Sequence, residues 1–172
     1  STAIASYAQA ISGVTVSLTD ANPQAVGGGQ GTDTLVGITG LIGSSYNDTL
    51  TGTSGNDSFD ISLGGNDTVN AGGGNDTIIA GTALNTSDVI DGGTGTDTLF
   101  LSGNSSLGLA GVTNVEIISL GAGFNYALAA NNANVAAGPT LPLDSSAVGV
   151  GKTVSFFGQA ETDGNYYFIG GA

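Results

Sequence analysis

The chain has 172 residues, with fourteen acidic side chains and a single basic one, Lys152, so its formal net charge is −13. This charge argues against nucleic acid and anionic membrane surfaces as partners, because both recruit Lys and Arg, and it favours cations. Apolar residues make up 40% of the chain and charged residues 9%, which excludes a disordered composition, and no apolar run is long enough for membrane insertion.

The first predicted element is a strand at Val14–Leu18, where apolar and polar residues alternate. A turn follows at residues 20–23, since Pro23 cannot donate a hydrogen bond to a strand ladder. We therefore expect residues 1–27 to form one or more N-terminal solenoid coils.

Residues 28–100 are a block of seven nine-residue frames, which begin at residues 28, 43, 52, 62, 71, 83 and 92. Position six of every frame is an aspartate: Asp33, Asp48, Asp57, Asp67, Asp76, Asp88 and Asp97. Position eight is always apolar: Leu35, Leu50, Phe59, Val69, Ile78, Ile90 and Leu99. Glycines crowd the first four positions, and glycine tolerates the positive φ angles of tight turns. A fixed period of this kind predicts stacked coils of a repeat protein.

Each frame divides into a six-residue turn and a three-residue strand, so two frames complete one coil and successive turns fall on opposite edges. Same-edge aspartates then lie two frames apart. The interval from Asp48 to Asp67 equals that from Asp57 to Asp76, and the next interval is again the same on both edges. The interval from Asp33 to Asp48 is shorter, which predicts one shortened coil with its far turn near residues 39–40. The strands are predicted to stack as two parallel sheets.

The rows of aspartates point to a divalent cation. Stacked strands lie about 4.8 Å apart, so same-edge carboxylates would repel by about 3 kcal/mol per pair at an effective dielectric of about 20. Zinc prefers His or Cys, which the chain lacks, and magnesium keeps its waters, whereas calcium accepts carboxylate and carbonyl oxygens together. The sequence therefore predicts several calcium ions between the coils, with a solvated acidic edge as the alternative.

Residues 101–172 lack the aspartate column but keep short apolar strands, at 114–120, 140–143, 153–157 and 166–169. They predict solenoid coils that bind no calcium, and the glycine-rich end suggests a further repeat in a longer polypeptide. Only residues 125–137 are rich enough in alanine to suggest a helix. No pattern brings together the acids outside the block, so we interpret them as surface residues and not as an acid–base pair: Glu116, Asp144, Glu161 and Asp163.

The frames resemble the nonapeptide G-G-x-G-x-D-x-U-x of the RTX (repeats-in-toxin) family, most closely as GGQGTDTLV, AGGGNDTII and GGTGTDTLF. The resemblance implies an all-β fold, a right-handed parallel β-roll or β-solenoid whose calcium-binding turns continue into coils without calcium. It implies carboxylate ligands at all seven position-six aspartates. It implies carbonyl ligands at Gly55, Gly65, Gly72, Gly74, Gly93 and Gly95. Tyr46 and Thr86 stand where the family has glycine, which predicts weaker sites in those two turns.

The resemblance also implies export by type I secretion to the cell surface or the extracellular space, with folding on calcium after export. We expect a calcium-stiffened structural segment of a large secreted surface protein, such as a surface layer, fibre or adhesin. Its partners would be calcium ions, adjacent segments of the same polypeptide and further copies in an array or fibre. Two alternatives remain: the accessory domain of a secreted enzyme or toxin, and a module that binds ice or glycans. Without His or Cys the usual nucleophile–base pairs are absent, so we expect no catalytic activity.

Overall fold

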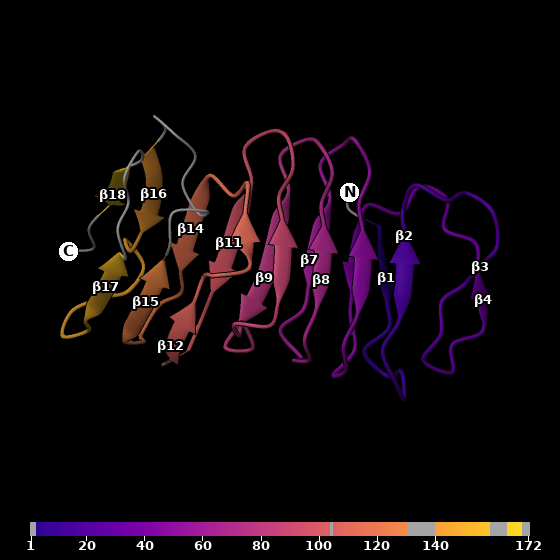
Figure 1. Ribbon diagram of the computed structural model, residues 1–172, viewed down its shortest axis with the longest axis horizontal. Coiled ribbons are helices and arrows are strands. Elements are labelled where there is room, and N and C mark those ends of the chain that lie inside the picture. The colour runs from indigo at the N-terminus through magenta and orange to yellow at the C-terminus, as the bar shows by residue number, and fades with distance from the viewer. Residues whose placement is uncertain (1–2, 104, 131–139, 159–164, 170–172) are drawn as a thin grey trace.

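Strands of two to five residues separated by glycine turns build an elongated β-solenoid in this computed structural model (Figure 1). The structure describes residues 3–103, 105–130, 140–158 and 165–169, and these residues contain strands and turns without a helix. No segment suited to crossing a membrane as a helix occurs in that part of the chain. The predicted all-β class is confirmed.

One parallel sheet runs along the whole solenoid. Its eight strands are, in order, β1 (Ile4–Ser6), β5 (Gly40–Ile42), β7 (Ser58–Asp60), β9 (Thr77–Gly81), β11 (Thr98–Leu101), β14 (Ile117–Leu120), β16 (Thr140–Asp144) and β18 (Asn165–Ile169). Each strand pairs with one from the preceding or following coil, never with its neighbour in sequence. This is the arrangement that the two-frame coil predicts.

Two shorter sheets follow one another on the opposite side. The first contains β2 (Thr15–Ser17), β6 (Thr49–Thr51), β8 (Thr68–Asn70), β10 (Val89–Asp91) and β13 (Val112–Thr113). The second contains β12 (Ser105–Gly108), β15 (Tyr126–Ala130) and β17 (Val154–Gly158). The solenoid therefore continues beyond the repeat block, as predicted, but with a different sheet on one side.

In the repeat block, the centre of the core between the sheets is formed by the position-eight column. Val69 lies between Leu50 and Ile90 in one sheet, and Ile78 lies between Phe59 and Leu99 in the other. All six side chains are 0–1% exposed, because successive side chains of a strand point to opposite faces and these six point inward. Leu35, the seventh member of the predicted column, is only half-buried.

The predicted shortened coil between Asp33 and Asp48, with its far turn near residues 39–40, is wrong, and β5 begins at Gly40. β2 pairs directly with β6, so the coil before β6 is formed by the N-terminal segment that carries β1 and β2. Residues 18–39 are an insertion that carries the antiparallel strands β3 (Gln24–Ala25) and β4 (Thr32–Asp33). Four glycines with positive φ, at 27, 28, 29 and 31, reverse the chain there. Val26 is buried, and the insertion lies at the end of the solenoid beyond β2 (Figure 1).

The C-terminal strands are confirmed with one exception. The strand predicted at 114–120 begins later, as β14 at Ile117, because Asn114 has a left-handed backbone with φ of 50°. The helix suggested at residues 125–137 is wrong for its first part, since β15 occupies 126–130; residues 131–139 lie outside the described part of the chain. Pairing of β15 with β12 and β17 outweighs the helix propensity of alanine.

Candidate metal centre

Six aspartates form two buried rows, one on each edge of the solenoid. We call the turns 43–48, 62–67 and 83–88 the Asp67 edge, and the turns 52–57, 71–76 and 92–97 the Asp76 edge. The six side chains are at most 4% exposed, which is unusual for unpaired acids: Asp48, Asp57, Asp67, Asp76, Asp88 and Asp97. The turns hold them inside the solenoid, next to the apolar column.

The aspartates of each row are joined through the main chain. The Asp48 N–H donates to Asp67 Oδ1 at 2.9 Å, and the Asp67 N–H donates to Asp88 Oδ1 at 2.8 Å. The Asp76 edge repeats the pattern, with Asp57 donating to Asp76 and Asp76 to Asp97, both at 2.7 Å. One oxygen of each accepting carboxylate is therefore satisfied by the preceding coil. The carboxylates are neighbours, as predicted, but these donors reduce their repulsion.

A second ladder, which the sequence analysis missed, runs along the outside of the turns at position five. The Asn66 N–H donates to Asn47 Oδ1, and on the other edge the Asn75 N–H donates to Asn56 Oδ1. Thr96 continues this edge by donating to Asn75. The repeated Asn-Asp pairs in the sequence were the signal that could have predicted this ladder. The Asn side chain bonds toward the following coil and the Asp side chain toward the preceding one, so adjacent turns are held in both directions.

The turns are of two kinds, which differ in whether the second oxygen of the aspartate carboxylate has a hydrogen-bond donor. In capped turns a residue of the same turn donates to it. Ser44 N–H donates to Asp48 Oδ2 at 2.5 Å, and the Ser44 hydroxyl donates to Oδ1 at 2.8 Å. Thr53 donates to Asp57 Oδ2 through both its N–H and its hydroxyl, and Asn85 N–H donates to Asp88 Oδ2.

In the open turns of Asp67, Asp76 and Asp97, no such donor is present within the described structure. Asp76 Oδ2 and Asp97 Oδ2 are fully buried without a hydrogen-bond partner, and so is Asp57 Oδ1. Burial raises the pKa of Asp67 to about 7 and that of Asp76 to about 6, from the ordinary 3.8, and raises the pKa of Asp97 as well. A backbone hydrogen bond opposes each rise and neighbouring carboxylates add to it. Burial, more than the predicted repulsion, is thus the main cost of these charges.

The predicted carbonyl ligands lie in backbone that only glycine adopts easily. Gly65, Gly72, Gly74, Gly93 and Gly95 have φ between 89° and 134°, whereas Gly55 is not in this region. A Cβ on Gly72, Gly93 or Gly95 would collide with a main-chain carbonyl of the preceding coil on that edge. The turns therefore bring main-chain carbonyl oxygens close to the neighbouring turn, where an ion between coils would need them.

Calcium fits this donor set. The described residues contain no group of three or more His, Cys, Asp or Glu side chains that could hold a metal ion. The donor set available to an ion between coils is therefore carboxylate oxygens together with turn carbonyls. Calcium binds such mixed oxygen sets. Buried anionic oxygens without donors are costly, and a cation compensates them. When bound, the ion would supply positive charge to these oxygens and link neighbouring turns.

Two acids lie in places the sequence analysis did not expect. Asp33 is outside both rows: it ends β4, and its Oδ2 accepts a hydrogen bond from Tyr7 Oη at 2.9 Å. The predicted Asp33–Asp48 pair is therefore absent, and Val14 donates to Asp48 in its place. Glu116, interpreted as a surface residue, instead extends the Asp76 edge, because the Asp97 N–H donates to Glu116 Oε2 at 2.8 Å. The signal was its distance along the chain from Asp97, which matches the repeat interval on this edge.

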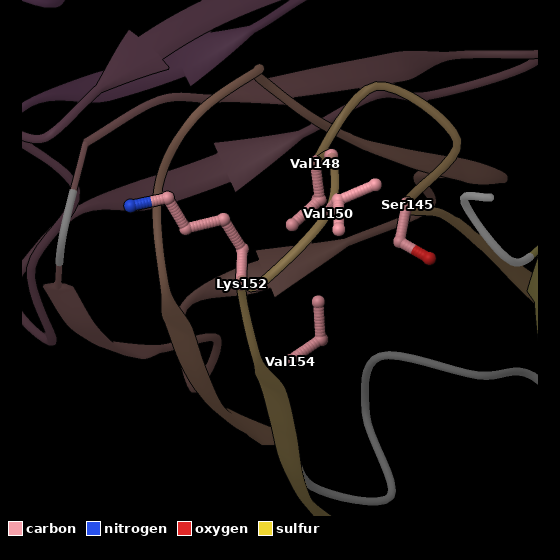
Figure 2. Close-up of a pocket in the computed structure, with 7 residues that line it drawn as sticks. Ser145, Val148, Val150, Lys152 and Val154 are labelled. Atoms are coloured by element: carbon pink, nitrogen blue, oxygen red, sulfur yellow. The ribbon is translucent and has the colours of Figure 1, made fainter.

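A shallow hollow near the C-terminal end has a different character. Figure 2 shows Val148 and Val150 on its loop, with the Lys152 side chain extending away from them. No acid lines it: the residues are Ser145, Val148, Gly149, Val150, Gly151, Lys152 and Val154. It offers no donor set for calcium.

Parallel coils with glycine turns and buried aspartate rows define a repeat β-solenoid of the cation-binding type. The family model described as RTX calcium-binding nonapeptide repeat (4 copies) matches residues 41–60, 61–86 and 82–105. This part of the chain consists of RTX repeats, which are structural calcium-binding motifs, and the resemblance is confirmed. The match begins after the frame of Asp33, in agreement with its position outside the rows. Comparison with curated proteins and with solved structures finds no match.

Proposed function

We propose that this chain is a calcium-dependent structural segment of a large secreted cell-surface protein, such as a surface layer, fibre or adhesin. The observation that carries the proposal is the pair of buried aspartate rows, in which Asp76 and Asp97 keep carboxylate oxygens without donors. The ligands would be the six aspartates of the rows with turn carbonyls of the glycines at 55, 65, 72, 74, 93 and 95. Calcium linking adjacent coils would stiffen the solenoid along its length.

The same chemistry supports a switch between compartments. RTX repeats are typical of proteins exported by type I secretion. Extracellular calcium-binding modules have dissociation constants of about 10⁻⁴–10⁻³ M, far above cytosolic calcium. Inside the cell the buried acids would oppose folding, and outside it calcium would bind the folded state and stabilise it.

Circular dichroism with and without calcium tests this function. In excess EDTA we expect the β signal of the repeat block to fall, and millimolar calcium should restore it where an equal concentration of magnesium does not. The reason is that magnesium retains its water and fits a carbonyl-rich site poorly. A full β signal in EDTA, unchanged by calcium, would contradict the proposal.

The alternatives need different observations. An upstream catalytic domain in the parent polypeptide would favour the accessory domain of a secreted enzyme or toxin. For an ice- or glycan-binding module, the relevant surface is the outer face of β2, β6 and β8, where Thr15, Thr49 and Thr68 are exposed and aligned. Three further position-seven residues, Ser58, Thr77 and Thr98, lie on the opposite sheet, and Val89 follows Thr68 on the first one. Ice shaping or glycan binding lost on Thr49→Val substitution would support that module.

A further inference from the structure

We propose that the two edges load calcium unequally: the Asp76 edge binds ions first, and Glu116 is the carboxylate ligand at its C-terminal end. This inference rests on the proposed calcium function and concerns which residues perform it. The missing glycines at Tyr46 and Thr86 already predict weaker sites in two turns of the Asp67 edge. The repeat pattern does not show which carboxylate oxygens have donors, and it ends before Glu116.

On the Asp67 edge, protein donors satisfy the carboxylates of the two outer turns, Asp48 and Asp88. The middle turn, that of Asp67, is open, but its oxygens are not among the fully buried, unpartnered ones. The side-chain amide of Asn85 donates to the carbonyl of Gly65 at 2.8 Å, across the gap between turns 62–67 and 83–88. The Asn85 N–H also satisfies Asp88 Oδ2. At the other end of this edge, Ser44 and the Val14 N–H satisfy both oxygens of Asp48.

On the Asp76 edge, the corresponding oxygens have no donor. Gly72 and Gly93 occupy the position that Ser44 and Thr53 occupy in capped turns, so no hydroxyl is available to Asp76 or Asp97. Their Oδ2 atoms are buried and unpartnered, and the side chains are 1% and 0% exposed. Asp57 is capped by Thr53 on one oxygen, but its Oδ1 is also buried and unpartnered. Each gap on this edge therefore adjoins an uncompensated anionic oxygen.

The last gap of the Asp76 edge lies between the turn of Asp97 and the segment that carries Glu116. Glu116 accepts the Asp97 N–H in the way that each aspartate accepts from the preceding one. Asp97 Oδ2 and the carbonyl oxygen of Asn114 both lie against the Cα of Gly92, where an added Cβ would meet them. Two carboxylates and a main-chain carbonyl thus converge at this end. Calcium takes such mixed oxygen ligands, and the single base of the chain, Lys152, lies outside this turn.

The test compares matched Asp→Asn variants of the full chain by calorimetric titration with calcium and by thermal melting. Asp97→Asn keeps the Oδ1 that accepts from Asp76 and removes the unpartnered Oδ2. We expect its metal-free melting temperature to stay close to that of the unaltered chain. Its calcium affinity should fall roughly 10- to 100-fold, with at least one ion lost from the stoichiometry.

Asp88→Asn is the control on the opposite edge, and the opposite result is expected. Its new amide cannot accept from the Asn85 N–H, so the metal-free melting temperature should fall. The ions that bind first should keep their affinity, and the ion lost should be a later, weaker one, because Asp88 lies on the Asp67 edge. Glu116→Gln tests the terminal ligand and should lose one ion, whereas Asp20→Asn, an equal charge change in the N-terminal turn, should lose none.

The outcomes separate this inference from the function on which it rests. Calcium binding by the unaltered chain with equal losses in Asp97→Asn and Asp88→Asn would overturn the unequal loading alone. Full stoichiometry and affinity in Glu116→Gln would overturn the terminal ligand. A complete lack of calcium binding by the unaltered chain would overturn the proposed function and this inference with it.

Discussion

The residue at position two of a frame determines whether the aspartate of that turn receives a side-chain hydrogen bond from its own turn. Where position two carries a hydroxyl, as in Ser44 and Thr53, the carboxylate finds a donor in its own turn. Where it is glycine, as at Gly72 and Gly93, the main chain of the preceding coil approaches instead. Glycine at this position gives no side-chain hydrogen bond to the aspartate, but it lets the main chains of adjacent turns lie close together. An ion between coils needs this short separation.

Gly95 and Gly55 occupy the same position of two turns and give a matched test. Gly95→Ala should destabilise the calcium-bound protein by about 1–3 kcal/mol or more, because alanine is strained at positive φ. The φ of Gly95 is 134°, and a Cβ would also collide with the Gly74 carbonyl. Gly55→Ala should change stability by less than about 0.5 kcal/mol, since its nearest neighbour would be Thr53 Oγ1 at 3.6 Å. Equal losses in urea denaturation would refute this account.

At the level of elements, each strand is too short to hold its place alone. A three-residue strand such as β7 contributes one buried side chain, Phe59, and hydrogen bonds to the coils on either side. Stability therefore comes from stacking, as in other repeat proteins, where each unit contacts only its neighbours. The Asp and Asn hydrogen-bond ladders also link each coil to the next along the solenoid axis.

Two phenylalanines test this dependence on the inner column. Phe59→Ala should lower the free energy of unfolding by about 3–5 kcal/mol, because Phe59 is fully buried between the sheets. Phe100→Ala should cost less than about 1 kcal/mol, since Phe100 is 43% exposed on the outer face of β11. Denaturant titration in calcium measures both. Similar losses for the two variants would be incompatible with the alternation of buried and exposed side chains along each strand.

For the whole molecule, the balance between acids and cations sets the conditions for folding. Thirteen net negative charges and buried carboxylates with raised pKa values oppose the metal-free fold at neutral pH. Protons and calcium ions compete for the same carboxylate oxygens. Protons should offset the free-energy cost of the buried charges at low pH, and calcium should offset it at neutral and higher pH. The solenoid is therefore expected to respond to both.

The pH dependence without metal has a defined sign. The pKa of Asp67 is raised to about 7 and that of Asp76 to about 6, so the folded state holds protons that the unfolded state has released. Their contribution to stability is complete below an unfolded pKa near 3.8 and is lost as the pH rises through 6–7. In chelator, the melting temperature should be higher near pH 5 than near pH 8. Calcium should reverse this order, and a metal-free protein that is more stable near pH 8 would contradict the assignment.

The nine-residue period is a local property that every frame repeats, so the sequence alone predicts the two-frame coil, most of the apolar column and the stacking of six of the seven position-six aspartates. The positions of Asp33 and Glu116, the burial of the aspartates and the donors to their carboxylate oxygens follow from the three-dimensional fold. Asn85 reaches Gly65, and Glu116 reaches Asp97, across a full coil of chain in each case. Such contacts depend on which turns are stacked together, and the insertion at residues 18–39 changes that stacking without interrupting the nonapeptide pattern that contains Asp33.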